Sequence, residues 1–308
     1  MLTLRGLTKR HGGTVAVDDL TLDVEEGRVT GFLGPNGAGK STTMRMILGL
    51  DHPTAGTALI DGRPYAQLPH PLREVGALLD AKALHPARSA RGHLIAQARS
   101  NGIPVRRVDE VLERVGLASV ARKRAGAFSL GMYQRLGIAG ALLGDPKVLV
   151  LDEPVNGLDP EGVRWVRELV REQAEQGRTV FLSSHLMSEM QLTADRLVVI
   201  GKGRLLADLP MADLLARSTS ASVRVRTADP AELHRLAAEL RGVDLDLQGE
   251  TALIARGTTA SAVGDLAHHL GVRLHELHSV TPSLEQAYME LTAQSVEYGT
   301  TSEPKAGV

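Results

Sequence analysis

The sequence of 308 residues has no cysteine, few aromatic residues, no excess of either charge and no long apolar run. Without cysteine the chain can form neither a disulfide nor a thiol nucleophile. Its net charge of −1 gives no reason to expect nucleic acid as a partner. No apolar run reaches the roughly eighteen residues of a membrane span, and the N-terminus lacks a signal-peptide core. A cytoplasmic location is therefore expected.

Residues 1–216 alternate apolar runs with helical patterns. The apolar runs, at 28–34, 147–153, 179–185 and 196–203, read as strands buried on both faces. The helical patterns lie between them, at 41–50, 105–115, 131–144 and 161–176. This alternation predicts an α/β domain with a mainly parallel core sheet covered by helices.

The pattern changes near residue 217. The expected order beyond it is strand 222–227, helix 230–240, strands 243–248 and 251–256, helix 260–270 and strand 272–278. This order predicts a small ferredoxin-like α+β accessory domain over 217–294. It includes a last helix at 282–292, and the tail at 295–308 is expected to be disordered.

Four histidines in this part invite a metal interpretation: His268, His269, His275 and His278. No carboxylate cluster accompanies them, and 272–278 alternates as a strand does. An accessory domain is therefore favoured over a metal site.

A glycine-rich stretch offers a phosphate site. Residues 34–42 read Gly34, Pro35, Asn36, Gly37, Ala38, Gly39, Lys40, Ser41 and Thr42, which matches GxxxxGK[ST] between an apolar strand and a helical pattern. Glycine allows the backbone to turn its N–H groups toward an anion, and the helix N-terminus adds a positive dipole end. Lys40 could then reach the β- and γ-phosphates of a nucleotide, and Ser41 could ligate Mg²⁺. The alternative is a glycine-rich turn that binds nothing.

Two acids follow the apolar run 147–151. Asp152 stands where a second Mg²⁺ anchor is expected, and Glu153 stands where a general base could activate water. Two solvated acids at a strand end are the alternative. These features alone describe any P-loop ATPase or GTPase.

Five motifs in order narrow the class: GPNGAGKST (34–42), FSLGMYQR (128–135), LVLDEP (149–154), NGLD (156–159) and SSH (183–185). With them, residues 2 to about 215 resemble the ATP-binding subunit of an ABC transporter. The resemblance implies an ATPase of P-loop fold that uses ATP and Mg²⁺. It also implies an antiparallel β part and a helical subdomain at about 81–145, which receives a coupling helix of the permease.

The resemblance also gives FSLGMYQR a role. In that family the signature, here Ser129, Leu130, Gly131 and Met132, grips the γ-phosphate of ATP held by the other subunit of a head-to-tail dimer. The physics is again a helix N-terminus that meets an anion. An ATP-dependent homodimer is therefore expected. Ser129 also reads as an ordinary helix N-cap, and the two roles do not compete.

Further roles follow from the resemblance. His185 matches the switch histidine, and Asp159 matches the aspartate that links the two sites of the dimer, although it also reads as a helix cap. Asp80 stands where the family has a glutamine that senses Mg²⁺ and the membrane partner, so a metal contact is expected. The alternative is a loop aspartate that makes no metal contact. His11 replaces the tyrosine that stacks on adenine, and Val17 could add an apolar contact.

The SLGM signature and the acid at position 80 resemble the drug and lantibiotic exporter branch of the family. The expected partner is a separate polytopic permease, with this chain peripheral on the inner face of the membrane. The rivals are a soluble ATPase of the same class acting on DNA or the ribosome, and a regulatory ATP sensor. Glu153 and His185 argue against the sensor.

Overall fold

The computed structural model describes residues 1–80, 84–217, 222–280, 284–285 and 287–289. The chain forms two compact units, Met1–Met211 and Ala212–Gln294. The division lies a few residues before the change of pattern near residue 217. Each unit is described by itself.

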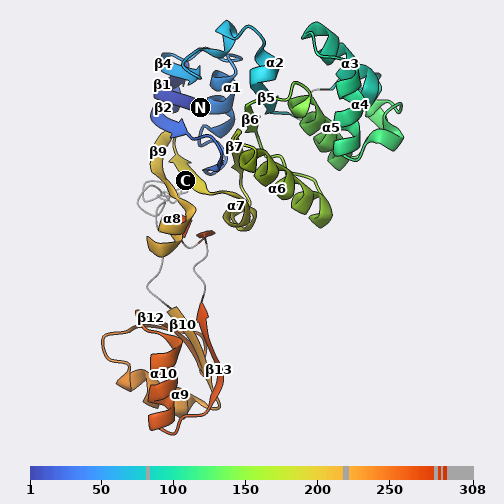
Figure 1. Cartoon of the computed structure of the whole chain (residues 1–308). Coiled ribbons are helices and arrows are strands. Elements are labelled where there is room, and N and C mark those ends of the chain that lie inside the picture. The colour runs from blue at the N-terminus through green and yellow to red at the C-terminus, as the bar shows by residue number, and fades with distance from the viewer. Residues whose placement is uncertain (81–83, 218–221, 281–283, 286, 290–308) are drawn as a thin grey trace, which may run out of the picture. The chain divides into compact units, whose positions relative to one another are not determined.

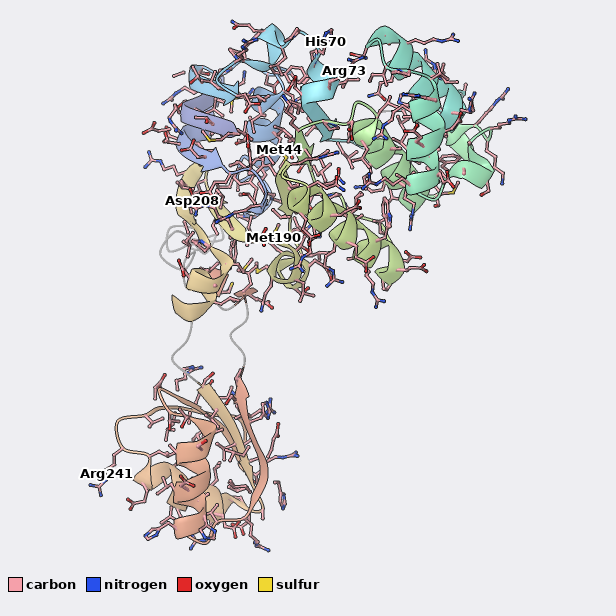
Figure 2. All side chains as sticks on the ribbon, viewed as in Figure 1. Met44, His70, Arg73, Met190, Asp208 and Arg241 are labelled. Carbon is pink, nitrogen blue, oxygen red and sulfur yellow. The ribbon has the colours of Figure 1, made fainter. Side chains whose placement is uncertain are left out.

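A six-stranded sheet forms the centre of the first unit, in the order β5-β6-β7-β3-β8-β9. The strands are β3 (Val29–Leu33), β5 (Val75–Leu78), β6 (Val148–Leu151), β7 (Thr179–Ser184), β8 (Arg196–Gly201) and β9 (Arg204–Pro210). All neighbours are parallel except β8 and β9, which pair antiparallel. The predicted parallel core is confirmed, and β5 and β9 are additions. An ion pair of 2.6 Å between Arg196 and Asp208 ties β9 to β8 (Figure 2).

A second, antiparallel sheet has the order β2-β1-β4, with β1 (Leu2–His11), β2 (Thr14–Val24) and β4 (Ala55–Ile60). Its buried side chains join those of the six-stranded sheet and of helix α1 (Lys40–Ile47) in one apolar core that contains Leu4, Phe32 and Met44. The rings of Phe32 on β3 and Phe181 on β7 lie 4.9 Å apart. The core therefore fixes the start of α1 relative to the ends of the parallel strands.

Two helices follow the strands that carry the acidic and histidine motifs. Helix α6 (Pro160–Glu175) precedes β7, and α7 (Met187–Thr193) lies between β7 and β8. Helix α7 packs closely on β3: a Cβ on Gly31 would stand 2.2 Å from the sulfur of Met190 (Figure 2) and 3.1 Å from the Cβ of Ala194.

A helical lobe lies beside the sheets (Figure 1). It contains α3 (Ala90–Ser100), α4 (Arg106–Arg114), the short turns η2 (Ala118–Val120) and η3 (Ala125–Ala127), and α5 (Leu130–Leu142). Helix α5 packs on β5, where a Cβ on Gly76 would stand 2.0 Å from the carbonyl oxygen of Ala141. The remaining elements before the lobe are η1 (Tyr65–Gln67) and α2 (Pro71–Glu74).

The second unit is a four-stranded antiparallel sheet in the order β11-β12-β10-β13, with two helices on one face (Figure 1). Its elements are α8 (Met211–Arg217), β10 (Ser222–Thr227), α9 (Pro230–Glu239), β11 (Asp244–Leu247), β12 (Ala252–Arg256), α10 (Ala260–His269) and β13 (Leu274–Val280). The order and the sheet confirm the ferredoxin-like prediction. Alternate residues such as Val223, Val225 and Leu253 bury their side chains with the helices.

Some predictions reach beyond the described residues. Only 284–285 and 287–289 of the expected helix at 282–292 are described, and they are helical, whereas the expected tail at 295–308 lies outside the description. Among the described helices, none is both long and apolar enough to cross a membrane.

Candidate nucleotide site

The loop between β3 and α1 borders a pocket that we call the phosphate-loop pocket. Its lining consists of Ala16, Asn36, Gly37, Ala38, Gly39, Lys40, Ser41, Thr42, Asp152 and Glu153. Gly37 and Gly39 have φ angles of 80° and 106°, and a Cβ on Gly39 would stand 2.5 Å from the carbonyl oxygen of Ala16. Helix α1 begins at Lys40, directly after Gly39, so the N–H groups at its start open on the pocket.

Lys40 is held over this loop. Its ammonium group is mostly buried and donates hydrogen bonds to the carbonyl oxygens of Gly34 at 2.6 Å and Pro35 at 3.3 Å. These oxygens offset part of the cost of burying a charge. A polyanion in the pocket would meet both the cation and the start of α1, so the cradle fits phosphate groups.

Asp152 faces the pocket from the end of β6. Its backbone N–H donates to the carbonyl oxygen of Leu78, and its carboxylate accepts a hydrogen bond of 2.5 Å from the hydroxyl of Ser183 on β7. This carboxylate and the hydroxyl of Ser41 line the same pocket. Oxygen donors of this kind are those that Mg²⁺ prefers, so the donor set fits that ion.

Glu153 and His185 meet at the edge of the pocket. The Glu153 Oε2 atom lies 2.7 Å from the Nδ1 atom of His185 and accepts a hydrogen bond of 3.3 Å from the backbone N–H of the same residue. The glutamate side chain is 23% exposed and the histidine 51%. A carboxylate in contact with an imidazole at a phosphate-binding pocket has the composition of an acid–base pair.

The predicted residues for the nucleotide base lie at the hairpin of β1 and β2. His11 is exposed at the end of β1. Val17 is 1% exposed and belongs to the apolar core, whereas Ala16 beside it lines the pocket. The contacts of His11 and Val17 with a base remain predictions, and Ala16 is a lining residue that the sequence reasoning missed.

The signature residues line a different pocket, which we call the signature pocket. It is formed by Ser129, Leu130, Gly131, Met132, Arg135, Gly157, Leu158 and Asp159. It shares no lining residue with the phosphate-loop pocket. The sequence places 128–135 and 156–159 far apart, and the fold brings them together here.

Two helix N-termini meet at the signature pocket. Ser129 caps α5 by accepting a hydrogen bond of 3.3 Å from the N–H of Met132, and Asp159 caps α6 through the N–H of Gly162 at 2.8 Å. The Leu130 side chain covers Gly157, where an added Cβ would stand 2.2 Å from it. Both expected caps are therefore present, at two helix N-termini that border one pocket.

Asp80 lies in neither pocket. It lines a groove where the helical lobe meets the sheets, together with Arg45, Leu48, Leu50, Tyr65, Leu72, Val75, Ala77, Leu79, Gln97 and Gly140. Most of these side chains are apolar, and Leu50 is 58% exposed. The groove thus combines apolar surface with an acid that stands two residues after Leu78, the backbone partner of Asp152.

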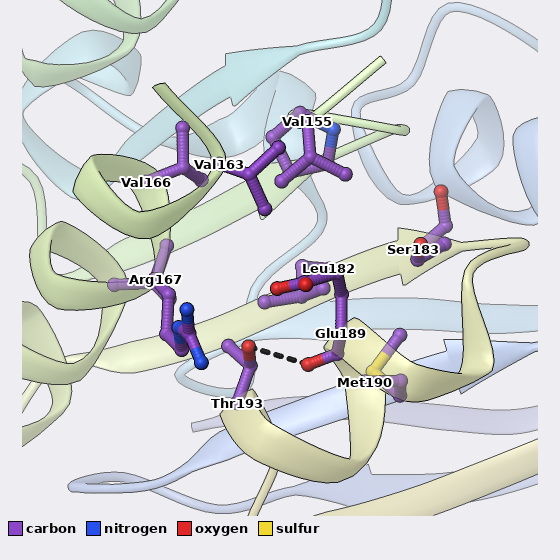
Figure 3. Close-up of a pocket in the computed structure, with 12 residues that line it drawn as sticks. Val155, Val163, Val166, Arg167, Leu182, Ser183, Glu189, Met190 and Thr193 are labelled. Carbon is purple, nitrogen blue, oxygen red and sulfur yellow. Dashed lines mark hydrogen bonds between the residues drawn. The ribbon is translucent and has the colours of Figure 1, made fainter. Parts of the chain in front are cut away.

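A further small cavity lies behind the acidic loop (Figure 3). It is enclosed by β7, α6 and α7, and its lining includes Val155, Val166, Leu182 and Met190. The one hydrogen bond drawn there, of 2.7 Å, runs from the Thr193 hydroxyl to the carbonyl oxygen of Glu189. Its lining shares no residue with the phosphate-loop pocket.

Two polar side chains that the sequence reasoning missed hold the acidic loop. The hydroxyl of Ser183 accepts from the N–H of Glu153 at 2.9 Å, and the amide of Gln134 donates to the carbonyl oxygen of Glu153 at 2.8 Å. Both lie inside recognised motifs, SSH and FSLGMYQR, which was the available signal. Among the described residues of the whole chain, no group of three or more histidines and acids is placed to hold a metal ion.

Comparison with known proteins gives the class. The family model described as "ABC transporter" matches residues 17–156, and one described as a domain of unknown function matches residues 221–285. The chain is 36% identical to the uncharacterized ABC transporter ATP-binding protein YhcH of Bacillus subtilis, over 96% of this chain and 97% of that protein. It is 44% identical to the bacitracin transport ATP-binding protein BcrA of Bacillus licheniformis, over 69% and 70%.

The first unit also has solved counterparts. The dimeric structure of a bacterial ABC transporter cassette, MJ0796, superposes with a TM-score of 0.64 at 24% identity, over 68% of this chain and 99% of that one. The chain belongs to the ATP-binding proteins of ABC transporters. It is accordingly an ATP-binding and ATP-hydrolysing subunit, in agreement with the resemblance seen in the sequence.

Proposed function

We propose that this protein powers the export of antibiotics or similar compounds through a separate membrane permease. The name of the bacitracin transport relative supports the cargo class. The observation that carries the proposal is the division of the nucleotide machinery between two pockets of one chain that share no residue. Each chain then supplies the phosphate-loop half of one nucleotide site and the signature half of another.

In the proposed dimer, two chains face each other head to tail. The phosphates of each ATP lie on Lys40 and the start of α1 of one chain, and the start of α5 of the other chain covers the γ-phosphate. Each helix N-terminus offers N–H groups to an anion, so two ATP molecules bridge the chains. Asp159 stands in the signature pocket, where it could relay between the two sites.

The proposed chemistry uses the groups at the edge of the phosphate-loop pocket. Glu153 accepts a proton from the attacking water, and His185 orients the carboxylate and contacts the γ-phosphate. Ser41 and Asp152 would hold Mg²⁺, which neutralises developing charge on the phosphates when it is bound. Ser183 fixes the Asp152 carboxylate for that role.

The groove at Asp80 is the proposed contact with the permease. Its exposed Leu50 and the half-buried Tyr65 offer apolar surface between lobe and sheets, which suits an amphipathic helix. Asp80 stands two residues after Leu78, whose carbonyl oxygen accepts from the N–H of Asp152. A partner bound in the groove could therefore affect the phosphate-loop pocket through this short stretch of chain. The proposal therefore places the chain on the inner face of the membrane, through its partner.

The test is a co-purification from the native host. Tagged Glu153→Gln chain is expressed there, membranes are solubilised in mild detergent with MgATP, and the bound proteins are identified by mass spectrometry. We expect one polytopic membrane protein in near-equal amount. The double variant Leu50→Asp/Tyr65→Ala, which spoils the groove but neither pocket, should lose it.

Other outcomes would redirect the proposal. Ribosomal proteins, or DNA with repair factors, in place of a membrane protein would assign the same ATPase to the rival soluble class. An unchanged yield of permease with the groove variant would place the contact elsewhere on the chain.

A further inference from the structure

The backbone of Glu153 is held in an unusual conformation. Its φ angle is 49°, in the left-handed region that side chains other than glycine rarely adopt. Pro154 follows and restricts the backbone further. Such a conformation costs of the order of 1–3 kcal/mol and persists where neighbouring groups impose it. The neighbours that impose it here therefore decide where the Glu153 carboxylate points.

Hydrogen bonds from two different elements hold this residue. On its N-terminal side, the N–H of Glu153 donates to Ser183 on β7, a strand of the rigid sheet. On its C-terminal side, its carbonyl oxygen accepts from the Nε2 atom of Gln134 at 2.8 Å. Gln134 is 4% exposed, so water does not compete for this bond.

Gln134 comes from the helix that forms the signature pocket. Helix α5 begins at Leu130 with Ser129 as its cap, and Gln134 lies little more than one turn further along. One end of this short stretch thus borders the signature pocket, and the other end holds the backbone of Glu153 in the phosphate-loop pocket. No other described side chain donates a hydrogen bond from the lobe to Glu153.

We propose that Gln134 is a positioning residue that aims the Glu153 carboxylate according to the state of the signature in its own chain. When the start of α5 closes on the phosphates of the partner's ATP, the helix moves as a rigid rod and carries Gln134 with it. The carbonyl of Glu153 follows, and the carboxylate turns toward or away from the water in its own site. The inference rests on the proposed dimer and names how its two sites communicate.

The first test is Gln134→Met, which keeps the length of the side chain and removes the donor. The Glu153 carbonyl still accepts from the N–H of Asn156 at 3.1 Å, so the loop should fold. We expect kcat for ATP to fall at least about tenfold while KM stays within about twofold, because a misaimed base slows chemistry and leaves binding intact. The matched control is Gln173→Met in α6, a buried glutamine that bonds Arg178 and touches neither pocket, which should leave kcat unchanged.

The second test separates aiming from simple damage to the signature. Mixed dimers are prepared in which one chain carries Glu153→Gln, so that a single base works, and phosphate release is measured in one turnover. With Gln134→Met in the chain that has the working base, we expect release at least about tenfold slower than in the reference dimer. With Gln134→Met in the Glu153→Gln chain, we expect release at the reference rate.

Equal slowing in both mixed dimers would overturn the inference, because the glutamine would then serve the signature in trans. An unchanged kcat of Gln134→Met would overturn it as well. Failure of the proposed dimer looks different, since the Glu153→Gln chain would then show no ATP-dependent dimer in the first place.

Discussion

The phosphate-loop pocket and the signature pocket share one feature, a helix N-terminus, but differ in the side chains around it. Both contain the N-terminus of a helix, α1 at Lys40 and α5 at Leu130. The phosphate-loop pocket adds a buried ammonium group and two carboxylates. The signature pocket adds small and apolar residues and, as its charged side chains, Asp159 and Arg135. The comparison teaches that the charged groups suited to phosphate and metal are gathered in one pocket, whereas the other pocket offers little besides helix N-termini, as expected of a half-site in the proposed dimer.

The largest effect is expected from Lys40→Ala. Among the described residues that line the phosphate-loop pocket, Lys40 alone is a cation, and a hydrogen bond to a charged group contributes about 1.5–3 kcal/mol. We expect the affinity for ATP, measured by calorimetry, to fall by about one to two orders of magnitude. Affinity close to wild type would contradict the phosphate-loop assignment, and Arg63→Ala in a turn outside both pockets provides the control.

Ser129→Ala tests the other pocket. It removes the cap of α5, which costs about 1 kcal/mol of stability, and one hydroxyl that lines the signature pocket. We expect the single chain to bind ATP as before, while ATP-driven dimerisation weakens by about tenfold. Thr259→Ala removes an equivalent cap from α10 in the second unit and should leave dimerisation unchanged. Equal effects of the two variants would reduce Ser129 to an ordinary cap.

A smaller effect is expected from Asp80→Gln. Asp80 lines the groove beside the lobe and not the phosphate-loop pocket. If it contacts the metal, replacing an acid by an amide should raise the Mg²⁺ concentration that gives half-maximal ATPase activity. Asp109→Asn, in an exposed ion pair with Arg91, is the control. The same Mg²⁺ dependence in both variants would leave Asp80 without a metal role.

The smallest effect concerns the stability of the lobe that carries the signature. Burial lowers the pKa of His93 in α3, and the charge of Arg88 lowers it further. The unfolded chain binds this proton near pH 6.5, at a higher pH than the folded chain, so stability falls as the pH drops below about 6.5. We expect His93→Gln to lose less melting temperature than wild type between about pH 7 and pH 5.5. Parallel curves for the two proteins would show that His93 does not contribute.

The sequence predicted the elements that carry a periodic signal. Apart from α8, the helices and strands of the second unit were found within about two residues, because each alternates or repeats over its own length. The phosphate loop was found because glycines, lysine and serine stand at fixed spacing. The strands β1, β2, β4, β5 and β9 were not placed, since β1 and β2 alternate only irregularly and β5 is four residues long.

The contacts within the site were less predictable. Ser183 and Gln134 stand in recognised motifs, yet their bonds to Glu153 span 30 and 19 residues of sequence. Such bonds depend on how α5 and β7 pack beside the loop, which no local spacing encodes. The place of Ala16 at the pocket has the same origin, because the hairpin of β1 and β2 brings it against Gly39 across 23 residues of sequence.

The most direct test of two half-sites in one chain is the mass of the Glu153→Gln variant in solution. Light scattering after size exclusion is measured with and without MgATP. The account predicts a single chain of 32.9 kDa without nucleotide and a dimer of about twice that mass with MgATP. It also predicts that adding Ser129→Ala shifts this equilibrium back toward the monomer. A monomer at saturating MgATP, with ATP bound, would contradict the account.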